Sequence, residues 1–128
     1  MNNLVIDASG NKIILTLIVD KNIYTCSHEN SKMNFEKMII LINNFLKDNK
    51  NTLDKIDSIY VNRGPGSFAG IRNSLSISKA LLLTKNIDYY CFSFEDFDGF
   101  DAVNYEDIPS LCEKFKIKKN LIKPIYLS

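Results

Sequence analysis

Short apolar runs separated by polar turns predict three β-strands at the start of the chain. The runs cover residues 4–6, 12–19 and 23–27, and polar turns fill residues 7–11 and 20–22. Apolar or β-branched runs bounded by Gly, Asn and Asp are typical of strands joined by tight turns. Because these connections are too short to contain a crossover helix, we expect an antiparallel meander.

The hydrophobic spacing then changes to the period of a helix. Over residues 33–48 the apolar side chains fall on one arc of roughly 160°, which predicts an amphipathic helix. A short strand is expected at 57–61, a second helix at 67–85 with Ser67 as its N-cap, and a fifth strand at 87–93. Successive strand–helix–strand steps imply parallel strands with right-handed crossovers. The expected fold class is therefore α/β, with a mixed five-stranded sheet built from the meander and a β-α-β-α-β unit.

Charge is separated along the C-terminal part of the chain, where the hydrophobic pattern weakens. Residues 95–107 contain six acidic residues and no basic one, whereas residues 112–123 contain five lysines and one glutamate. Such runs usually form solvated faces, although the two could also face one another or a partner. We expect a short helix at 109–119 and a terminal strand or edge segment at 124–127.

Composition narrows the class of protein. The 128 residues suffice for one core, and 45% hydrophobic and 24% charged residues are ordinary values for a globular domain. Sixteen basic and fifteen acidic residues give a net charge of +1, whereas a dedicated nucleic-acid-binding protein usually carries a larger positive excess. The sequence shows neither the pattern of a secretory signal nor an apolar run long enough for a membrane span. We therefore expect a cytoplasmic protein without a membrane partner.

Residue types that often carry chemistry are sparse. The three cysteines, Cys26, Cys91 and Cys112, are widely spaced and form no CxxC pair, which argues against a zinc site or a disulfide framework. The single histidine, His28, lies in a polar stretch and is expected on the surface. These residues therefore predict no metal site, and we also expect no catalytic residue and no cofactor.

Residues 61–72 carry the most specific local signal: a strand end, a sharp Gly-Pro-Gly turn at 64–66 and the start of a helix. The backbone N–H groups of residues 67–69 are predicted to point outward as an anion site. The spacing matches neither the Walker A loop nor the GxGxxG motif. The alternative interpretation is a tight turn that lets the helix pack closely.

The second predicted helix is apolar on several sides, which indicates that it is enclosed on several sides. One side covers the sheet, and the surplus requires a second layer: either the first helix or another subunit. Small residues such as Gly70 and Ser74 would let a neighbouring helix approach closely. Two alternatives remain open, in which the helices bury each other or form a protein interface.

The segment RGPGSFAGIR at residues 63–72 resembles the GRGPGSFTGLR-type signature of the bacterial TsaB (YeaZ) family. The opening LVIDAS at residues 4–9 resembles the family's ILAIDTS strand. SFE at residues 93–95 resembles its S-L-E motif, and PIYL at residues 124–127 resembles its P-x-Y-L-R motif. The resemblance is continuous over residues 1–97.

This resemblance implies an actin-like (ASKHA, RNase H-like) half-domain over residues 1–97. Family members usually have a second actin-like domain after this point. We expect residues 98–128 to form a reduced remnant or tail in its place.

The resemblance also implies a role in forming N6-threonylcarbamoyladenosine in tRNA. The chain is expected to be a non-catalytic partner of a TsaD-type paralogue, joined by a TsaE-type ATPase, and to contact tRNA only indirectly. Alone, it is expected to form a homodimer. The two helices would supply the interface through Met38, Leu41, Phe45, Gly70, Ser74, Ile77 and Leu81.

Two alternatives remain. One is a minimal nucleotide- or phosphate-binding enzyme. The resemblance implies this alternative because related actin-like ATPases approach phosphates with the loop after the first strand. Its candidate phosphate-binding residues are Asp7, Ser9, Gly10, Gly64, Gly66 and Ser67. The other is a structural protein that only self-associates.

Overall fold

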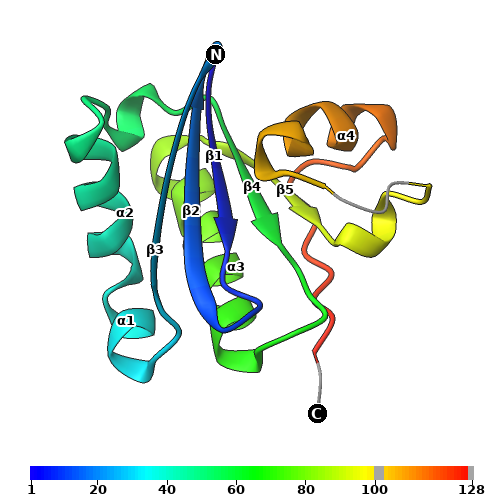
Figure 1. Cartoon of the computed structure of the whole chain (residues 1–128), viewed down its shortest axis with the longest axis horizontal. Coiled ribbons are helices and arrows are strands. Elements are labelled where there is room, and N and C mark those ends of the chain that lie inside the picture. Colours follow the sequence, from blue (N-terminus) through cyan, green and yellow to red (C-terminus); the bar gives the residue numbers. More distant parts are fainter. Residues whose placement is uncertain (100–102, 127–128) are drawn as a thin grey trace.

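The structure, a computed structural model, describes residues 1–99 and 103–126 and contains a five-stranded sheet covered on both faces (Figure 1). Its strands are β1 (Asn2–Asp7), β2 (Lys12–Val19), β3 (Asn22–Glu29), β4 (Ser58–Asn62) and β5 (Asp88–Phe92). Their order is β3-β2-β1-β4-β5. The first three strands form the antiparallel meander, and the last two continue the sheet parallel to β1. The predicted mixed α/β sheet is confirmed.

Helices lie on both sides of this sheet. On one face are α1 (Lys32–Glu36), α2 (Met38–Asp48) and α3 (Phe68–Lys85), and on the other is α4 (Ile108–Lys114) (Figure 1). Three single-turn 3₁₀ helices complete the described elements: η1 (Leu53–Lys55), η2 (Phe94–Asp96) and η3 (Tyr105–Asp107).

The prediction of one helix over residues 33–48 is wrong, because the backbone leaves the helical region at Lys37 (φ −100°, ψ 10°). Ser31 caps α1 by accepting a hydrogen bond from the N–H of Asn34 at 3.2 Å. After the break, α2 buries Met38 completely, whereas Met33 on α1 stays 62% exposed. The break therefore separates a buried helix from a short one that lies mostly at the surface.

Two hydrophobic clusters fill the space on either side of the sheet. Alternation along β1 sends Leu4 and Ile6 into the larger cluster, beneath α2 and α3, and Val5 into the smaller one, beneath α4. The smaller cluster contains Val5, Ile18, Tyr60, Phe92, Phe97, Ile108, Leu111 and Cys112. The segment around α4 therefore forms a third layer of the fold. The expected division at residue 97 stays a prediction, although both sides of it share this cluster.

The chain after α4 runs back along β5 and covers its outer edge. The N–H of Asn120 donates to the carbonyl of Tyr89 at 2.7 Å, and the N–H of Tyr89 donates to the Asn120 side-chain oxygen at 2.9 Å. Tyr126 forms a parallel bridge with Gly66. At the opposite edge, β3 pairs with β2 on one side and has no strand partner on its outer side among the described residues.

Two C-terminal predictions are corrected or limited by the structure. The helix predicted at 109–119 ends at Lys114, and Lys116 adopts a left-handed backbone (φ 55°) that a helix does not contain. The edge segment predicted at 124–127 is present as far as Tyr126. Leu127, Ser128 and the Asp101 of the acidic run lie outside the described residues.

Among residues 1–99 and 103–126, no helix combines the length and apolar character needed to cross a membrane.

Candidate functional site

Asp7, the first predicted phosphate-binding residue, lies at the end of β1 and is only 5% exposed. Its Oδ1 accepts hydrogen bonds from the N–H of Ser9 at 3.0 Å and from the hydroxyl of Ser9 at 2.6 Å. Its Oδ2 accepts a hydrogen bond from the hydroxyl of Tyr105 at 2.5 Å. Both carboxylate oxygens are therefore engaged within the chain.

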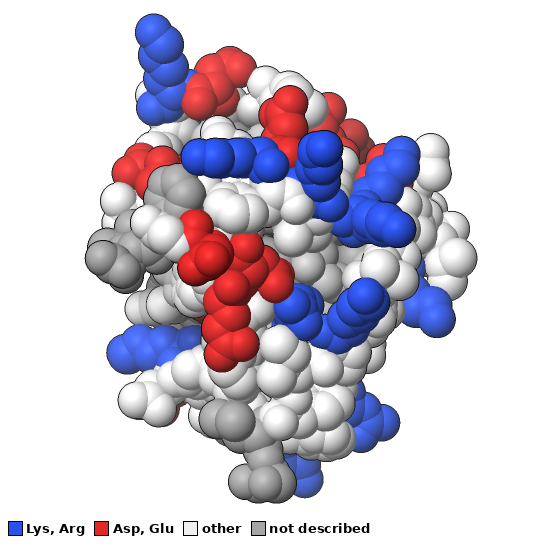
Figure 2. Space-filling model, turned by 90° about the vertical axis from the view of Figure 1, so that its right-hand side faces the viewer, with Lys and Arg blue, Asp and Glu red and all other residues white. Residues whose placement is uncertain are grey.

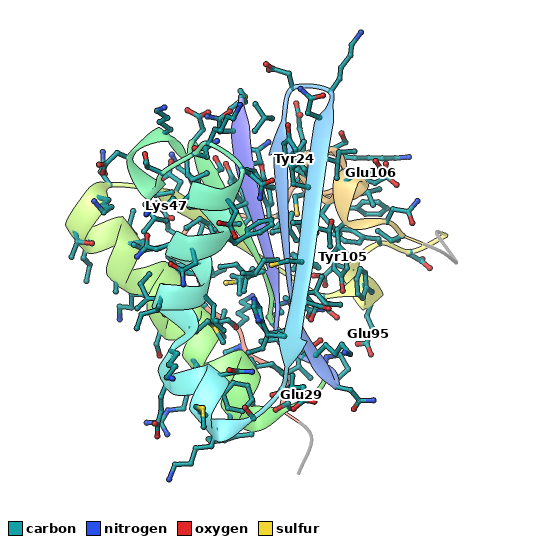
Figure 3. The ribbon with its side chains drawn as sticks, turned by 60° about the vertical axis from the view of Figure 1, so that its left-hand side comes forward. Tyr24, Glu29, Lys47, Glu95, Tyr105 and Glu106 are labelled. Carbon is teal, nitrogen blue, oxygen red and sulfur yellow. The ribbon has the colours of Figure 1, made fainter. Side chains whose placement is uncertain are left out.

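Tyr105 reaches Asp7 from the short helix η3, on the side of the sheet opposite α2 (Figure 3). Burial raises the pKa of the Tyr105 phenol, and its hydrogen bond to Asp7 raises that pKa further. The phenol consequently stays protonated and able to donate at neutral pH. Phosphate binding at Asp7 stays a prediction, and it would require Tyr105 to leave the carboxylate.

The glycines of the Gly-Pro-Gly turn are used for close contacts between backbone segments. Gly64 has φ 110°, and a Cβ built on it would lie 2.0 Å from the carbonyl oxygen of Ile125. A Cβ on Gly66 would lie 2.2 Å from the carbonyl oxygen of Ser9. Any larger residue at either position would force these backbones apart. The geometry therefore favours the interpretation of a tight turn with close packing.

Ser67 does not present its N–H outward as predicted. That group donates to the carbonyl of Ser9 at 2.8 Å and so closes the turn against the loop after β1. The Ser67 hydroxyl accepts a hydrogen bond from the N–H of Gly70 at 3.3 Å, which confirms Ser67 as the N-cap of α3. Gly10 lies at the tip of the loop, where its carbonyl accepts a hydrogen bond from the Asn30 side chain.

The seven predicted interface residues fall into two groups. Leu41 and Ile77 are partly buried and keep some exposed surface. The other five are buried inside the chain: Met38, Phe45, Gly70, Ser74 and Leu81. Packing of the helices on the sheet and on one another therefore explains most of the apolar surplus that the sequence showed.

The small residues of α3 serve contacts within the chain. A Cβ on Gly70 would lie 1.9 Å from the carbonyl oxygen of Ala8, so the glycine lets α3 approach the end of β1. Ser74 is fully buried and donates its hydroxyl to the carbonyl of Ile71 at 3.0 Å. Their small size gives no separate indication of a second subunit.

Other apolar residues of these helices are exposed and were not among the predicted interface residues. Ile40 on α2 is 53% exposed and Leu83 on α3 is 75% exposed. Ile40 has only polar neighbours one turn away, so the apolar arc predicted for this helix did not include it.

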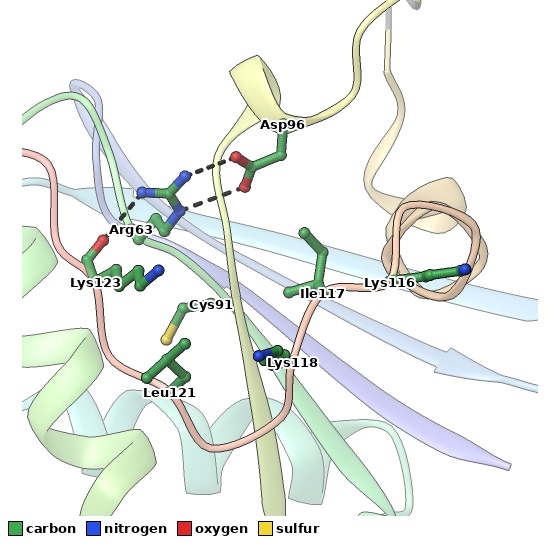
Figure 4. A pocket seen from close by; sticks show the side chains of 8 residues that line it. All are labelled: Arg63, Cys91, Asp96, Lys116, Ile117, Lys118, Leu121 and Lys123. Atoms are coloured by element: carbon green, nitrogen blue, oxygen red, sulfur yellow. Dashed lines mark hydrogen bonds and ion pairs between the residues drawn. The ribbon is translucent and has the colours of Figure 1, made fainter.

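Arg63, in the most specific sequence segment, connects three parts of the chain (Figure 4). Its guanidinium donates to both carboxylate oxygens of Asp96, at 2.6 and 3.4 Å, and to the carbonyl of Lys123 at 3.1 Å. The carbonyl of Arg63 accepts a hydrogen bond from the N–H of Ile125 at 2.7 Å. Sequence analysis gave Arg63 no role, because its partners are distant in the chain.

Residues 28–93, about half of the chain, match a family model described as TsaD, tRNA N6-adenosine threonylcarbamoyltransferase. The chain belongs to this family. The matched segment runs from the end of β3 through α1, α2 and α3 to the residue after β5, and so contains the Gly-Pro-Gly turn.

Two curated relatives of the chain are named tRNA threonylcarbamoyladenosine biosynthesis protein TsaB. The protein from Buchnera aphidicola subsp. Baizongia pistaciae is 30% identical over 86 residues, covering 57% of this chain and 39% of the relative. The protein from Buchnera aphidicola subsp. Schizaphis graminum is 31% identical over 90 residues, covering 70% and 43%. The resemblance to TsaB proteins is confirmed, and the chain spans about two-fifths of the length of these relatives.

Solved structures confirm the actin-like fold class. YeaZ from Pseudomonas aeruginosa matches with a TM-score of 0.66 and 18% identity, over 72% of this chain and 43% of that one. A second structure, described as an uncharacterised protein similar to peptidase YeaZ from the same organism, matches with the same values. The partial coverage of both fits a half-domain.

Proposed function

We propose that this chain acts in forming N6-threonylcarbamoyladenosine in tRNA as a non-catalytic partner of a TsaD-type protein. The observation that carries the proposal is the extent of the family match. The match spans α1, α2, α3 and the Gly-Pro-Gly turn, and leaves out the loop after β1, which holds Asp7. Relatives named for this biosynthesis support the choice of pathway.

The surface proposed for the partner is the outer side of α1, α2 and α3, called here the helix face. Leu41 and Ile77 are the two originally predicted residues that a partner can touch without opening the core. Ile40 adds an exposed apolar side chain on α2. The buried residues beneath, such as Met38 and Leu81, hold the helices in place. Exposed apolar side chains on packed helices favour a protein partner over solvent.

Further partners are proposed on the same basis. When no TsaD-type protein is present, the helix face would join two copies of this chain. A TsaE-type ATPase would bind the heterodimer, and tRNA would be held chiefly by the TsaD-type protein.

The competing hypothesis of a minimal phosphate-binding enzyme has less support. Asp7 is paired with Ser9 and Tyr105, and the N–H of Ser67 is bonded to a carbonyl of the chain. A phosphate would have to displace these contacts before it could bind.

Size-exclusion chromatography with light scattering tests the proposal. The chain is mixed at micromolar concentration with the TsaD-type protein of the same organism, and each protein is also run alone. The proposal predicts a heterodimer that replaces any homodimer of this chain. Elution of the two proteins as separate species would contradict it.

A further inference from the structure

A hollow of about 290 Å³ lies between the ends of β4 and β5, η2 and the C-terminal segment (Figure 4). It lies along the outer edge of β5, and none of its lining residues belongs to α1, α2 or α3. Its lining residues are Arg63, Cys91, Asp96, Lys116, Ile117, Lys118, Leu121 and Lys123.

The lining is strongly cationic. It combines one arginine and three lysines with one carboxylate, that of Asp96. This carboxylate is already committed, because it accepts hydrogen bonds from Arg63 and from the N–H of Ser93 at 2.8 Å. The space-filling view, on the side of the molecule that carries α4 and the chain after it, shows Lys and Arg side chains gathered together beside a separate compact group of acidic side chains (Figure 2).

The described part of the chain provides no ion-pair partner for the lysines of the hollow. Within the described residues, Lys116, Lys118 and Lys123 form no ion pair, whereas their neighbour Lys119 pairs with Asp88 at 3.5 Å. The ammonium groups of Lys118 and Lys123 point into the space around Cys91 (Figure 4). Like charges converging on a partly enclosed space repel one another unless an anion joins them.

The hollow holds its cations on a fixed frame. Asn120 bonds to Tyr89 and donates its side-chain N–H to Asp88 at 2.9 Å, which anchors the segment carrying Lys118. The carbonyl of Lys123 is held by Arg63. Arg63 itself keeps N–H donors beyond the three it has committed, in the planar arrangement that suits phosphate oxygens.

The remaining lining adds no negative charge. Burial raises the pKa of the Cys91 thiol to about 12, so this side chain is neutral at physiological pH. Ile117 and Leu121 supply apolar walls. A cationic rim around a neutral, partly apolar floor is suited to a phosphate group attached to a sugar or base.

We propose that this hollow binds a phosphate group, with Arg63 as the fixed ligand and Lys118 and Lys123 as adjustable ones. The same chemistry is offered by the backbone of an RNA and by a mononucleotide. The site is independent of the proposed partner protein, since none of its lining residues belongs to the three helices of the helix face and it needs no second chain.

Titration of the whole chain by NMR at low salt, without a partner protein, tests this site. The probes are inorganic phosphate, AMP and a short single-stranded RNA, and the readout is the shift of amide signals from residues 91, 118 and 123. Saturable shifts with phosphate and AMP assign the site to a single phosphate. Saturable shifts with RNA alone assign it to a polymer backbone.

A matched pair of double variants makes the test specific. Lys118→Glu with Lys123→Glu should weaken binding roughly tenfold or more, because two charge-assisted contacts are lost. Lys21→Glu with Lys55→Glu makes the same change in net charge at residues outside the hollow, and should alter the dissociation constant less than about twofold. Melting temperatures report whether each variant is folded. Absence of saturable binding to all three probes, or equal weakening in both doubles, would overturn the proposal.

Discussion

The hydroxyl of Tyr105 donates a hydrogen bond of 2.5 Å to the Oδ2 of Asp7, joining residues 98 positions apart in the chain. Asp7 ends the central strand, and Tyr105 belongs to the segment that covers the second face of the sheet. Their bond fixes that segment to the C-terminal end of β1, where a phosphate was expected. The segment around α4 is therefore both a structural layer and a cover over this carboxylate.

Replacing Tyr105 should measurably destabilise the fold. Tyr105→Phe leaves one oxygen of the buried Asp7 carboxylate without its partner, and should lower the free energy of unfolding by about 1–3 kcal/mol. Urea denaturation measures the change. Tyr24→Phe is the control, since Tyr24 is exposed on β3, and should change stability by less than about 0.5 kcal/mol. Equal stability of the two variants would show that the Tyr105–Asp7 bond contributes little.

Alkaline solution should weaken the fold through its buried thiols. Burial raises the pKa of Cys91 and Cys112 from the ordinary 9.0 to about 12. The folded chain then keeps protons that the unfolded chain releases, so stability falls as pH rises. This stabilisation is complete below pH 9.0 and is lost as pH approaches about 12.

Urea unfolding at neutral pH and at about pH 9.8, just below the pKa of free tyrosine, tests this dependence. The double variant Cys91→Ala, Cys112→Ala should lose less stability between the two pH values than the unchanged chain does. The difference between the two pH values is the readout, because the smaller side chains lower stability at both. If the two proteins show identical pH dependence, these thiols are not responsible.

The glycine at position 70 should tolerate no side chain. Gly70→Ala brings a Cβ to 1.9 Å from the carbonyl oxygen of Ala8, and relief of that clash should cost about 3 kcal/mol of stability. Gly10→Ala is the matched control, because nothing lies within 4 Å of its added Cβ. Differential scanning calorimetry should find a large drop in melting temperature for the first variant and almost none for the second. Similar melting temperatures would contradict the close approach of α3 to β1.

Charged substitutions on the helix face should split the proposed complex without unfolding the chain. Leu41→Asp or Ile77→Asp should weaken association with the TsaD-type protein about tenfold or more, since a carboxylate would be desolvated in an apolar contact. Ile23→Asp, on the exposed edge strand β3, makes the same change away from this face and should leave affinity unaltered. Calorimetric titration gives the affinities, and circular dichroism confirms the fold. Equal affinities for all three variants would exclude the helix face.

Local patterns predicted the strands and α3 well, because each is specified by its own residues. The apolar runs of β1 and β2 and the capping by Ser67 need no distant partner to be recognised. The break at Lys37 was missed, since the apolar period continues across it.

Long-range contacts determine what local patterns could not predict. The hydrogen bonds of Tyr105 to Asp7 and of Arg63 to Asp96 join segments that are distant in sequence, and no local residue spacing predicts them. The interface prediction erred on depth for a similar reason. Helical periodicity places Met38 and Leu81 on apolar sides of their helices. It does not tell whether the chain's own sheet or a partner covers these side chains.

The central claim, that this chain is a non-catalytic partner in tRNA threonylcarbamoylation, is tested most directly by a reconstituted modification assay. The reaction contains tRNA, the substrates, the TsaD-type protein and the TsaE-type ATPase, and N6-threonylcarbamoyladenosine is quantified with and without this chain. Little product is expected without it, full product with it, and none from this chain alone. Product formed by this chain alone, or a yield that does not change when it is added, would contradict the account.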